Sequence, residues 1–279
     1  MARTARLVTA AAFGCVLLSA SANAGANRAF VSALGNDANA CTITAPCRSL
    51  QAAFNVIAVA GEIEVLDPAA YGPLNITHSV MIEGHGWATV YGGVAAINVN
   101  AGPNDNVSLR GLVLQGIATK ANAVQVTGAG SVEVLDCEIR GFAGDGVSAS
   151  GGPLNIIIKN SIISKNGTGV DVISGGDSAI HVTVSNSVIA NNLQHGIIST
   201  GQGTAGATAT AIVRDSLVAD NGASGLFSGP GNVSHVMRST FRGNDIGLDP
   251  EGGSLISYGD NNVFDNRVDG HPTSTITGM

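Results

Sequence analysis

A short pattern recurs along most of this sequence and limits what the chain can fold into. Residues 160–172 read NSIISKNGTGVDV and residues 215–227 read DSLVADNGASGLF: in both, a Ser and two aliphatic residues precede an Asn-Gly pair. A repeat in the twenties of residues with no helical pattern inside it indicates a solenoid, in which each coil stacks on the next. Copies anchored at the Asn position, spaced 25, 24, 26, 29, 23 and 22 residues apart, fall at Ile117, Phe142, Asn166, Asn192, Asn221, Asn244 and Asn266.

Each period holds three short stretches in which apolar residues alternate with polar or variable ones. Successive side chains of a strand point to opposite faces, so the alternation predicts three strands in each coil, each with one face turned inward. Three such strands enclose a tube with a filled apolar interior. The residues expected inside are Val132, Val134, Ile156, Ile158, Val182, Val184, Ala211 and Val213 in the first strand, Ile139, Ile163, Ile189, Val218 and Phe241 in the second, and Val147, Val170, Ile197, Leu226 and Leu248 in the third.

The same register predicts two polar or small-residue columns. Asn accepts the left-handed backbone of a tight corner more readily than other residues with a side chain, and stacked amides can donate to and accept from one another. We therefore expect an asparagine ladder whose members are left-handed, at Asn166, Asn192, Asn221, Asn244 and Asn266. Cys137 is expected to be a buried packing residue, in a column with Ser161, Ser187, Ser216 and Ser239.

The first two dozen residues have the pattern of an export signal. Two arginines precede an apolar run from Leu7 to Leu18, and small residues lead to Ala24, after which cleavage is expected. A lipoprotein signal at Cys15 is the alternative, but the apolar run continues past that cysteine. No later apolar stretch is long enough to span a bilayer. We expect a secreted or periplasmic protein with a signal at residues 1–24, an arm at 25–48 and one domain at 49–279.

Composition excludes some partners. The net charge is −7, and export would remove two arginines and no acidic residue. Nucleic acids and anionic lipids need clustered cations, so neither is expected as a partner. Only 12% of residues are charged, while 44% are hydrophobic and 38 are Gly. This profile lacks the charge of a disordered chain and suits many short strands joined by tight turns.

Cysteine usage agrees with export. Cys41 and Cys47 flank a short Pro-containing segment, CTITAPC, and an oxidising compartment would join them in a disulfide that staples the N-terminal arm. Reduced thiols or a metal-binding pair are the alternatives.

The segment that follows resembles a known superfamily. Residues 47–84, CRSLQAAFNVIAVAGEIEVLDPAAYGPLNITHSVMIEG, resemble the opening of right-handed parallel β-helix proteins of the pectin lyase-like superfamily: a short helix, a Gly, a strand, a PxxY turn and a strand ending in IEG. The resemblance covers roughly residues 28–270. Leu50, Phe54 and Ile57 share one helical face, Ser49 is a candidate N-cap, and Gly61 is expected to close the helix. In that superfamily such a helix plugs the end of the tube. The expected fold is all-β, a right-handed parallel β-helix with an N-terminal capping helix.

The resemblance also suggests where catalysis would lie. Polygalacturonases of this superfamily carry an Asp, an Asp pair and a Gly-His-Gly on three successive coils, just before the third strand. The same column here holds Asp145, Thr168 and His195, so the middle acid is missing. Glycoside hydrolysis needs one carboxylic acid and one carboxylate, and a threonine replaces neither. Asp171, in a neighbouring outward column with Asp249, is a candidate for a displaced acid.

A calcium site and a non-catalytic sugar-binding site are the two other kinds of site that this superfamily suggests. Pectate lyases hold Ca²⁺ with carboxylates on adjacent coils, but Asp136 and Asp215 are separated by two coils that carry Asn, so no metal or other cofactor is predicted. Sugar binding without catalysis uses exposed aromatic faces, for which the candidates are Trp87, Tyr91 and Phe227.

These observations favour a protein that contacts extracellular or periplasmic polysaccharide, as a non-catalytic binding or surface-structural protein. The alternative is a divergent polysaccharide lyase or glycoside hydrolase of the same superfamily. A fold of this kind does not fix the function, because function depends on the site that the fold carries.

Overall fold

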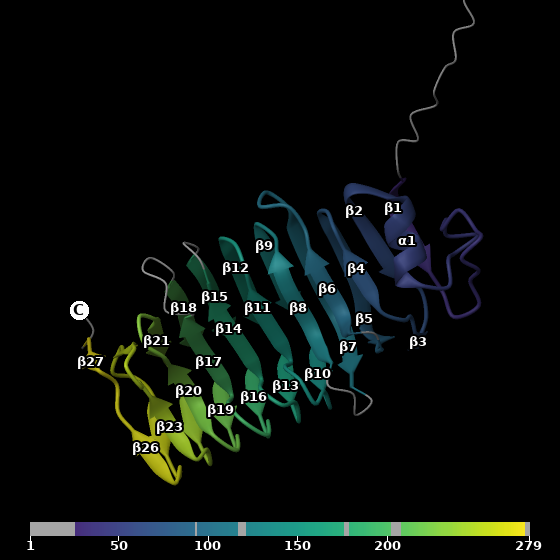
Figure 1. Cartoon of the computed structure of the whole chain (residues 1–279). Coiled ribbons are helices and arrows are strands. Elements are labelled where there is room, and N and C mark those ends of the chain that lie inside the picture. Colours follow the sequence, from purple (N-terminus) through teal and green to yellow (C-terminus); the bar gives the residue numbers. More distant parts are fainter. Residues whose placement is uncertain (1–25, 93, 117–120, 176–178, 202–207, 277–279) are drawn as a thin grey trace, which may run out of the picture.

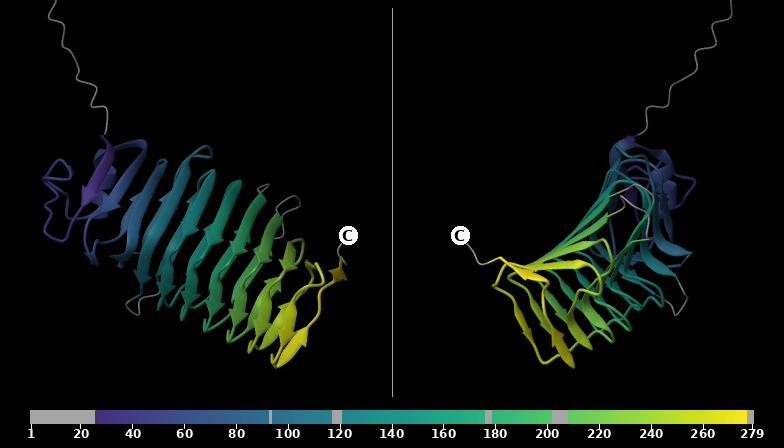
Figure 2. Two further views of the ribbon diagram at one scale, coloured as in Figure 1. Left: turned by 180° about the vertical axis from the view of Figure 1, so that it is seen from behind. Right: turned by 60° about the vertical axis from the view of Figure 1, so that its left-hand side comes forward.

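The chain winds into a tube of stacked coils built almost entirely from parallel strands (Figure 1). The computed structural model describes residues 26–92, 94–116, 121–175, 179–201 and 208–276, so the expected signal at residues 1–24 lies outside the described residues. Within them, one parallel sheet has 18 strands and the other has nine. Figure 2 shows the coils following one another from the N-terminal to the C-terminal end of the tube.

The larger sheet combines the first and second strands of the coils. The strands along the first side are β1 (Ala26–Val31), β2 (Ile57–Val65), β5 (Val80–Val90), β7 (Asn106–Gln115), β9 (Ser131–Leu135), β12 (Leu154–Lys159), β15 (Ala179–Ser185), β18 (Thr208–Arg214), β21 (Val233–Met237), β24 (Ser254–Ser257) and β27 (Ser274–Thr275). The strands along the second side are β3 (Ala69–Ala70), β10 (Glu138–Arg140), β13 (Ile162–Ser164), β16 (Val188–Ala190), β19 (Leu217–Ala219), β22 (Thr240–Arg242) and β25 (Asn262–Phe264). In the N-terminal coils, β5 and β7 run along both sides, because β5 pairs with both β2 and β3.

The smaller sheet contains the third strand of every coil. Its members are β4 (Leu74–Ile76), β6 (Ala95–Asn100), β8 (Asn122–Gly128), β11 (Val147–Ser150), β14 (Val170–Ser174), β17 (Ile197–Gly201), β20 (Ser224–Ser228), β23 (Ile246–Asp249) and β26 (Val268–Gly270). Each pairs in parallel with the strand one coil away, and Val147, Val170, Ile197 and Leu226 stand in one register. The predicted coil of three strands is therefore confirmed.

The interior of the tube holds the residues that the alternation predicted. Ile139, Ile163, Ile189, Val218 and Phe241 are all fully buried, as are Val147, Val170, Ile197 and Leu226 from the third strand. Because inward residues of successive coils stack directly, each coil buries its apolar side chains against the next one, which gives a continuous core along the tube.

A short helix covers the N-terminal end of the tube, as expected. Helix α1 (Leu50–Val56) buries Leu50, Ala53 and Phe54. Ser49 is its N-cap, with its hydroxyl accepting from the amide of Ala52. The expectation for Gly61 was wrong: the helix already ends at Val56, and Gly61 lies inside β2, because the chain turns directly into a strand that pairs with β1.

The arm before this helix is tied down at several points. Cys41 and Cys47 form the predicted disulfide, and both are buried. The carboxylate of Asp37 accepts hydrogen bonds from the amides of Arg48 and Ser49 and from the Ser49 hydroxyl. The arm and the first turn of the helix are thereby held as one unit.

The asparagine ladder is present, but its backbone explanation was wrong. The Nδ2 of Asn166 donates to Oδ1 of Asn192, Asn192 donates in the same way to Asn221, Asn221 to Asn244, and Asn244 to Asn266. None of the five has a positive φ. The left-handed residue is the one before each of them, at Lys165, Asn191, Asp220, Gly243 and Asp265.

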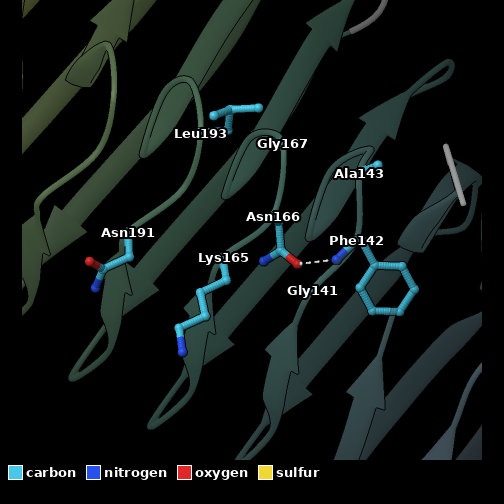
Figure 3. Close-up of a pocket in the computed structure, with 8 residues that line it drawn as sticks. All are labelled: Gly141, Phe142, Ala143, Lys165, Asn166, Gly167, Asn191 and Leu193. Carbon is cyan, nitrogen blue, oxygen red and sulfur yellow. Dashed lines mark hydrogen bonds between the residues drawn. The ribbon is translucent and has the colours of Figure 1, made fainter. Parts of the chain in front are cut away.

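This one-residue offset has a physical reason. The left-handed residue makes the bend, and the next side chain then points inward, where its amide can also serve the backbone. Asn166 accepts from the amide of Phe142, which occupies the ladder position of the preceding coil (Figure 3). Asn166 and Asn192 are each only 2% exposed. The ladder therefore satisfies buried backbone groups as well as other asparagines.

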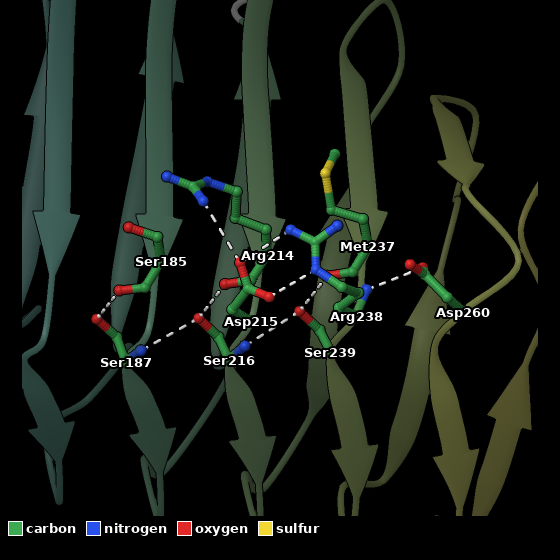
Figure 4. A network of polar contacts seen from close by, with 9 residues as sticks. All are labelled: Ser185, Ser187, Arg214, Asp215, Ser216, Met237, Arg238, Ser239 and Asp260. Carbon is green, nitrogen blue, oxygen red and sulfur yellow. Dashed lines mark hydrogen bonds and ion pairs between the residues drawn. The ribbon is translucent and has the colours of Figure 1, made fainter. Parts of the chain in front are cut away.

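A second ladder runs along the corner between the first and second strands. The amide of Cys137 donates to the hydroxyl of Ser161, and the same bond recurs from Ser161 to Ser187. Figure 4 shows the next two bonds, from Ser187 to Ser216 and from Ser216 to Ser239. Cys137 is a free, buried cysteine at the head of this column, as predicted. Each hydroxyl accepts from a backbone amide that the turn leaves without a strand partner.

Candidate functional site

The outer face of the nine-stranded sheet carries most of the candidate residues. From β4 to β23 of this sheet, one residue follows directly after a buried apolar residue and faces outward, and register places these residues in a single column along the tube. We call this set the outer column, and from the N-terminal end it consists of Asn75, Asn98, Gln125, Ser148, Asp171, Ile198, Phe227 and Asp249. Three amides, a hydroxyl, a carboxylate, an isoleucine, an aromatic ring and a second carboxylate thus follow one another on successive strands.

A second column lies beside it, at the corner where the chain enters the sheet. The amide of Gly146 donates to the carbonyl of Thr168, and that of Gly169 to the carbonyl of His195. Asp145, Thr168 and His195 therefore stand on three successive coils, in the positions expected from the sequence. Asn122 extends this corner column by one coil, with its Oδ1 accepting from the amide of Asp145 at 2.7 Å. Thr168 is buried and brings no acid to the middle position.

The two columns bring Asp145 and Asp171 together on neighbouring coils. Burial raises the pKa of Asp145, and a hydrogen bond with Ser148 opposes this. Burial also raises the pKa of Asp171, to about 7, with a further contribution from the negative charge of Asp145. Two carboxyl groups in a partly dehydrated setting, one of which disfavours the ionised form of the other, are a recurrent feature of functional sites.

His195 and Phe227 lie together further along the same face. Their ring centroids are 5.4 Å apart, with the planes tilted by 60°. The Nδ1 of His195 accepts from the amide of Ser224, and the hydroxyl of Ser224 donates to Asp249. Burial lowers the pKa of His195, and the charge of Asp249 opposes this. The ring is therefore a neutral acceptor at neutral pH, oriented by the backbone of the next coil.

The N-terminal half of the same face has a hollow that was not predicted. It has a volume of about 340 Å³ and is lined by Pro73, Asn75, Val94, Ala95, Asn98 and Gln125. The Nδ2 of Asn98 donates to Oδ1 of Asn75 at 3.4 Å. These amides could have been found in the sequence, because each stands between two apolar residues in LNI, INV and VQV, the pattern of the later third strands.

The other two predicted aromatic residues lie elsewhere. Trp87 belongs to β5 of the 18-stranded sheet, is 43% exposed, and packs beside His85 with a centroid distance of 5.1 Å. Tyr91 follows β5 at a corner and is 41% exposed. Only Phe227 of the three lies in the nine-stranded sheet, so the candidates do not form one aromatic row.

The carboxylates weighed as calcium ligands, Asp136 and Asp215, lie at the corner between the first and second strands. Asp136, Asn160, Asn186, Asp215 and Arg238 all have positive φ and make the turn there. Asp215 is paired with Arg238, at 2.7 Å, and with Arg214 (Figure 4). Among the residues that the structure describes, no three His, Cys, Asp or Glu side chains are grouped so that they could hold a metal ion.

A second hollow opens at the corner beside the asparagine ladder. It is lined by Gly141, Phe142, Ala143, Lys165, Asn166, Gly167, Asn191 and Leu193 (Figure 3). Phe142 and Asn166 are buried and engaged in the ladder, while Leu193 is 78% exposed. Without convergent polar groups, this hollow is a weaker candidate than the face of the nine-stranded sheet.

A parallel β-helix with polar residues in columns on one face is a fold that presents an extended surface along its axis. Residues 95–269 match the family model described as "right handed beta helix region", and the chain belongs to that family. No curated protein matches the sequence. None of the helices in the described ranges is long and apolar enough to cross a bilayer.

Three solved structures of distant sequence are similar to this chain to different degrees. A pectate lyase, Pel9A, superposes with a TM-score of 0.54 at 15% identity, over 82% of this chain and 67% of the other. A GH136 lacto-N-biosidase from Eubacterium ramulus gives 0.45 at 10% identity, over 89% and 66%. The A-module of the Azotobacter vinelandii mannuronan C-5 epimerase AlgE4 gives 0.35 at 12% identity, over 78% and 91%.

Proposed function

We propose that this protein binds polysaccharide on the outer face of the nine-stranded sheet, outside the cytoplasm, as a binding or surface-structural protein. The observation that carries the proposal is the outer column, in which hydrogen-bonding side chains from Asn75 to Asp171 are followed by the apolar residues Ile198 and Phe227. Sugars are bound by this combination, with polar groups on the hydroxyls and an aromatic face on the C–H groups. The fold shared with a pectate lyase supports polysaccharide as the class of ligand.

An extracellular place is supported by the disulfide between Cys41 and Cys47, which an oxidising compartment favours, and by the export pattern at residues 1–24. Cleavage near Ala24 is the corresponding expectation for the mature N-terminus.

The test is binding of the purified mature protein to a panel of soluble polysaccharides, measured by affinity gel electrophoresis. Phe227→Ala and Asn98→Ala should each weaken retention at least about fivefold, because a stacked ring and a buried hydrogen bond are each worth about 1 kcal/mol. Ile162→Ala is the matched control, since Ile162 is 48% exposed on the other sheet. Equal retention of all four proteins would exclude this face as the binding surface.

A second candidate function, hydrolysis of a glycosidic bond, is favoured by the Asp145–Asp171 pair. A carboxyl group with a raised pKa can protonate a leaving oxygen, while a second carboxylate activates water or attacks. Asp171 would be the acid and Asp145 the base. The test is release of reducing ends from the glycans that the protein binds. Activity that disappears in both Asp145→Asn and Asp171→Asn, with binding retained, would place the enzyme first.

A further inference from the structure

The charges on the outer face of the nine-stranded sheet are of one sign. Asp171 and Asp249 belong to the outer column and Asp145 to the corner column beside it. Of the lysines and arginines that the structure describes, none lies in a strand of this sheet. Burial raises the pKa of Asp171 to about 7, and the negative charge of Asp145 on the neighbouring coil adds to this.

Several described cations are engaged elsewhere and do not offset these carboxylates. Arg28 pairs with Glu62 and Glu64 at the N-terminal end of the larger sheet. Arg238 pairs with Asp215 at the corner between the first and second strands, and Arg267 pairs with Asp245 in the last coils. The carboxylates of Asp145, Asp171 and Asp249 therefore have no lysine or arginine beside them within the described strands of this sheet.

We propose that this face selects uncharged glycan chains and excludes free polyuronates, although the family fold is shared with a pectate lyase. The inference rests on the proposed function, whose binding face it uses. A polyuronate carries one carboxylate on every sugar, and like charges brought together across an interface are strongly disfavoured. An uncharged chain meets the same face without that cost, and its hydroxyl groups can donate to the aspartates.

The length of the outer column sets a minimum size for the ligand. Six strand-to-strand intervals separate Asn75 from Phe227, which at about 4.8 Å each makes a contact line of about 29 Å. A chain lying along the tube meets amides at the hollow, carboxylates in the middle and the aromatic ring of Phe227 near the other end. A polymer or long oligosaccharide should therefore be retained, and a disaccharide should not.

The sharpest test compares two ligands with the same sugar backbone, one with neutral methyl esters and the other with free carboxylates. Fully methyl-esterified homogalacturonan and its de-esterified form, polygalacturonate, are each titrated into the mature protein at pH 8 and low salt with EDTA, alongside a glucan, a xylan and a mannan. Asp171→Asn removes one charge from the face. Asp136→Asn is the matched control, because it removes one charge at a corner whose neighbouring coil already carries Asn160.

We expect at least one uncharged glycan to bind at least tenfold more tightly than polygalacturonate. Asp171→Asn should narrow that difference and Asp136→Asn should leave it unchanged. Binding of polygalacturonate as tightly as the best uncharged glycan would overturn the inference while leaving the proposed function in place. No binding of any glycan in the panel would instead refute the proposed function.

Discussion

The asparagine ladder allows a quantitative comparison between the middle and the end of the tube. Asn192 is 2% exposed and makes four side-chain hydrogen bonds. Its Nδ2 donates to Oδ1 of Asn221 at 3.0 Å and to the carbonyl of Ile163 at 3.4 Å. Its Oδ1 accepts from the backbone amide and from Nδ2 of Asn166, at 3.0 and 3.3 Å. Replacing Asn192 by Ala removes all four.

The free-energy cost of Asn192→Ala depends on which of these groups keep a hydrogen-bond partner. Nδ2 of Asn166 still reaches the carbonyl of Ile139, and Oδ1 of Asn221 still accepts from the backbone amide of residue 192. The backbone amide of Asn166 loses the acceptor that Asn192 provided. One buried unsatisfied group costs about 1–3 kcal/mol, and the lost bonds add to this, so we expect Asn192→Ala to destabilise the fold by about 2–4 kcal/mol.

Asn266→Ala is the comparison at the last rung. Asn266 is partly exposed, and water can replace much of its hydrogen bonding, so we expect a loss of about 1 kcal/mol or less. Urea unfolding followed by circular dichroism gives both values, with Gln194→Ala, an exposed amide at the same corner as Asn192, as the control. A loss at Asn266 equal to that at Asn192 would refute the account of the ladder as a buried network.

Three further predictions concern the carboxylates and the thiols. The raised folded pKa of Asp171 means that its contribution to stability is fully present below about pH 3.8 and is lost as the pH rises through about 7. Asp171→Asn should therefore match the original protein in thermal or urea unfolding near pH 4. At pH 8 the variant should be more stable than the original protein by about 1–2 kcal/mol. A pKa shift from 3.8 to about 7 corresponds to about 4 kcal/mol, and solvent screening reduces this value. A stability difference that grows toward low pH would contradict the raised pKa. Peptide mapping of the mature protein without reductant should find the Cys41–Cys47 bond and one free thiol at Cys137, unreactive until unfolding because burial raises its pKa to about 12; any bond to Cys137 would be inconsistent with the register. Reducing-end assays should detect no hydrolysis of polygalacturonate, because Thr168 occupies the middle position of the corner column, and release that depends on Asp145 would reverse this conclusion.

Much of the fold could be read from local spacing. The two-residue alternation identified the inward side of each strand, and the small residue before each second strand placed Cys137 in one column with Ser161. The N-cap at Ser49 and the disulfide of the arm could be predicted for the same reason. These features depend on residues close together in the chain or on the repeat period, and both can be identified from the amino-acid sequence.

The candidate site could be predicted only in part from the sequence. The column of Asp145, Thr168 and His195 followed from the repeat, as did the outward positions of Asp171 and Phe227. Trp87 could not be assigned to a face, because β5 carries a register shift between Glu83 and Ala88 that no alternation reveals. The conformation of the ladder was misjudged by one residue, since the bend and the inward side chain fall on adjacent positions.

The repeat and its two-residue alternation specify the coil, its three strands and the residues that fill the tube, because one stacking of the coils buries all of the apolar side chains. The three-dimensional arrangement was needed to show that Asp145 raises the pKa of Asp171, that the outer column continues to the amides of Asn75 and Asn98, and that Arg238 pairs with Asp215 at another corner. These properties arise between residues one or more coils apart, from the corner geometry that brings them together and from the water that packing excludes around them.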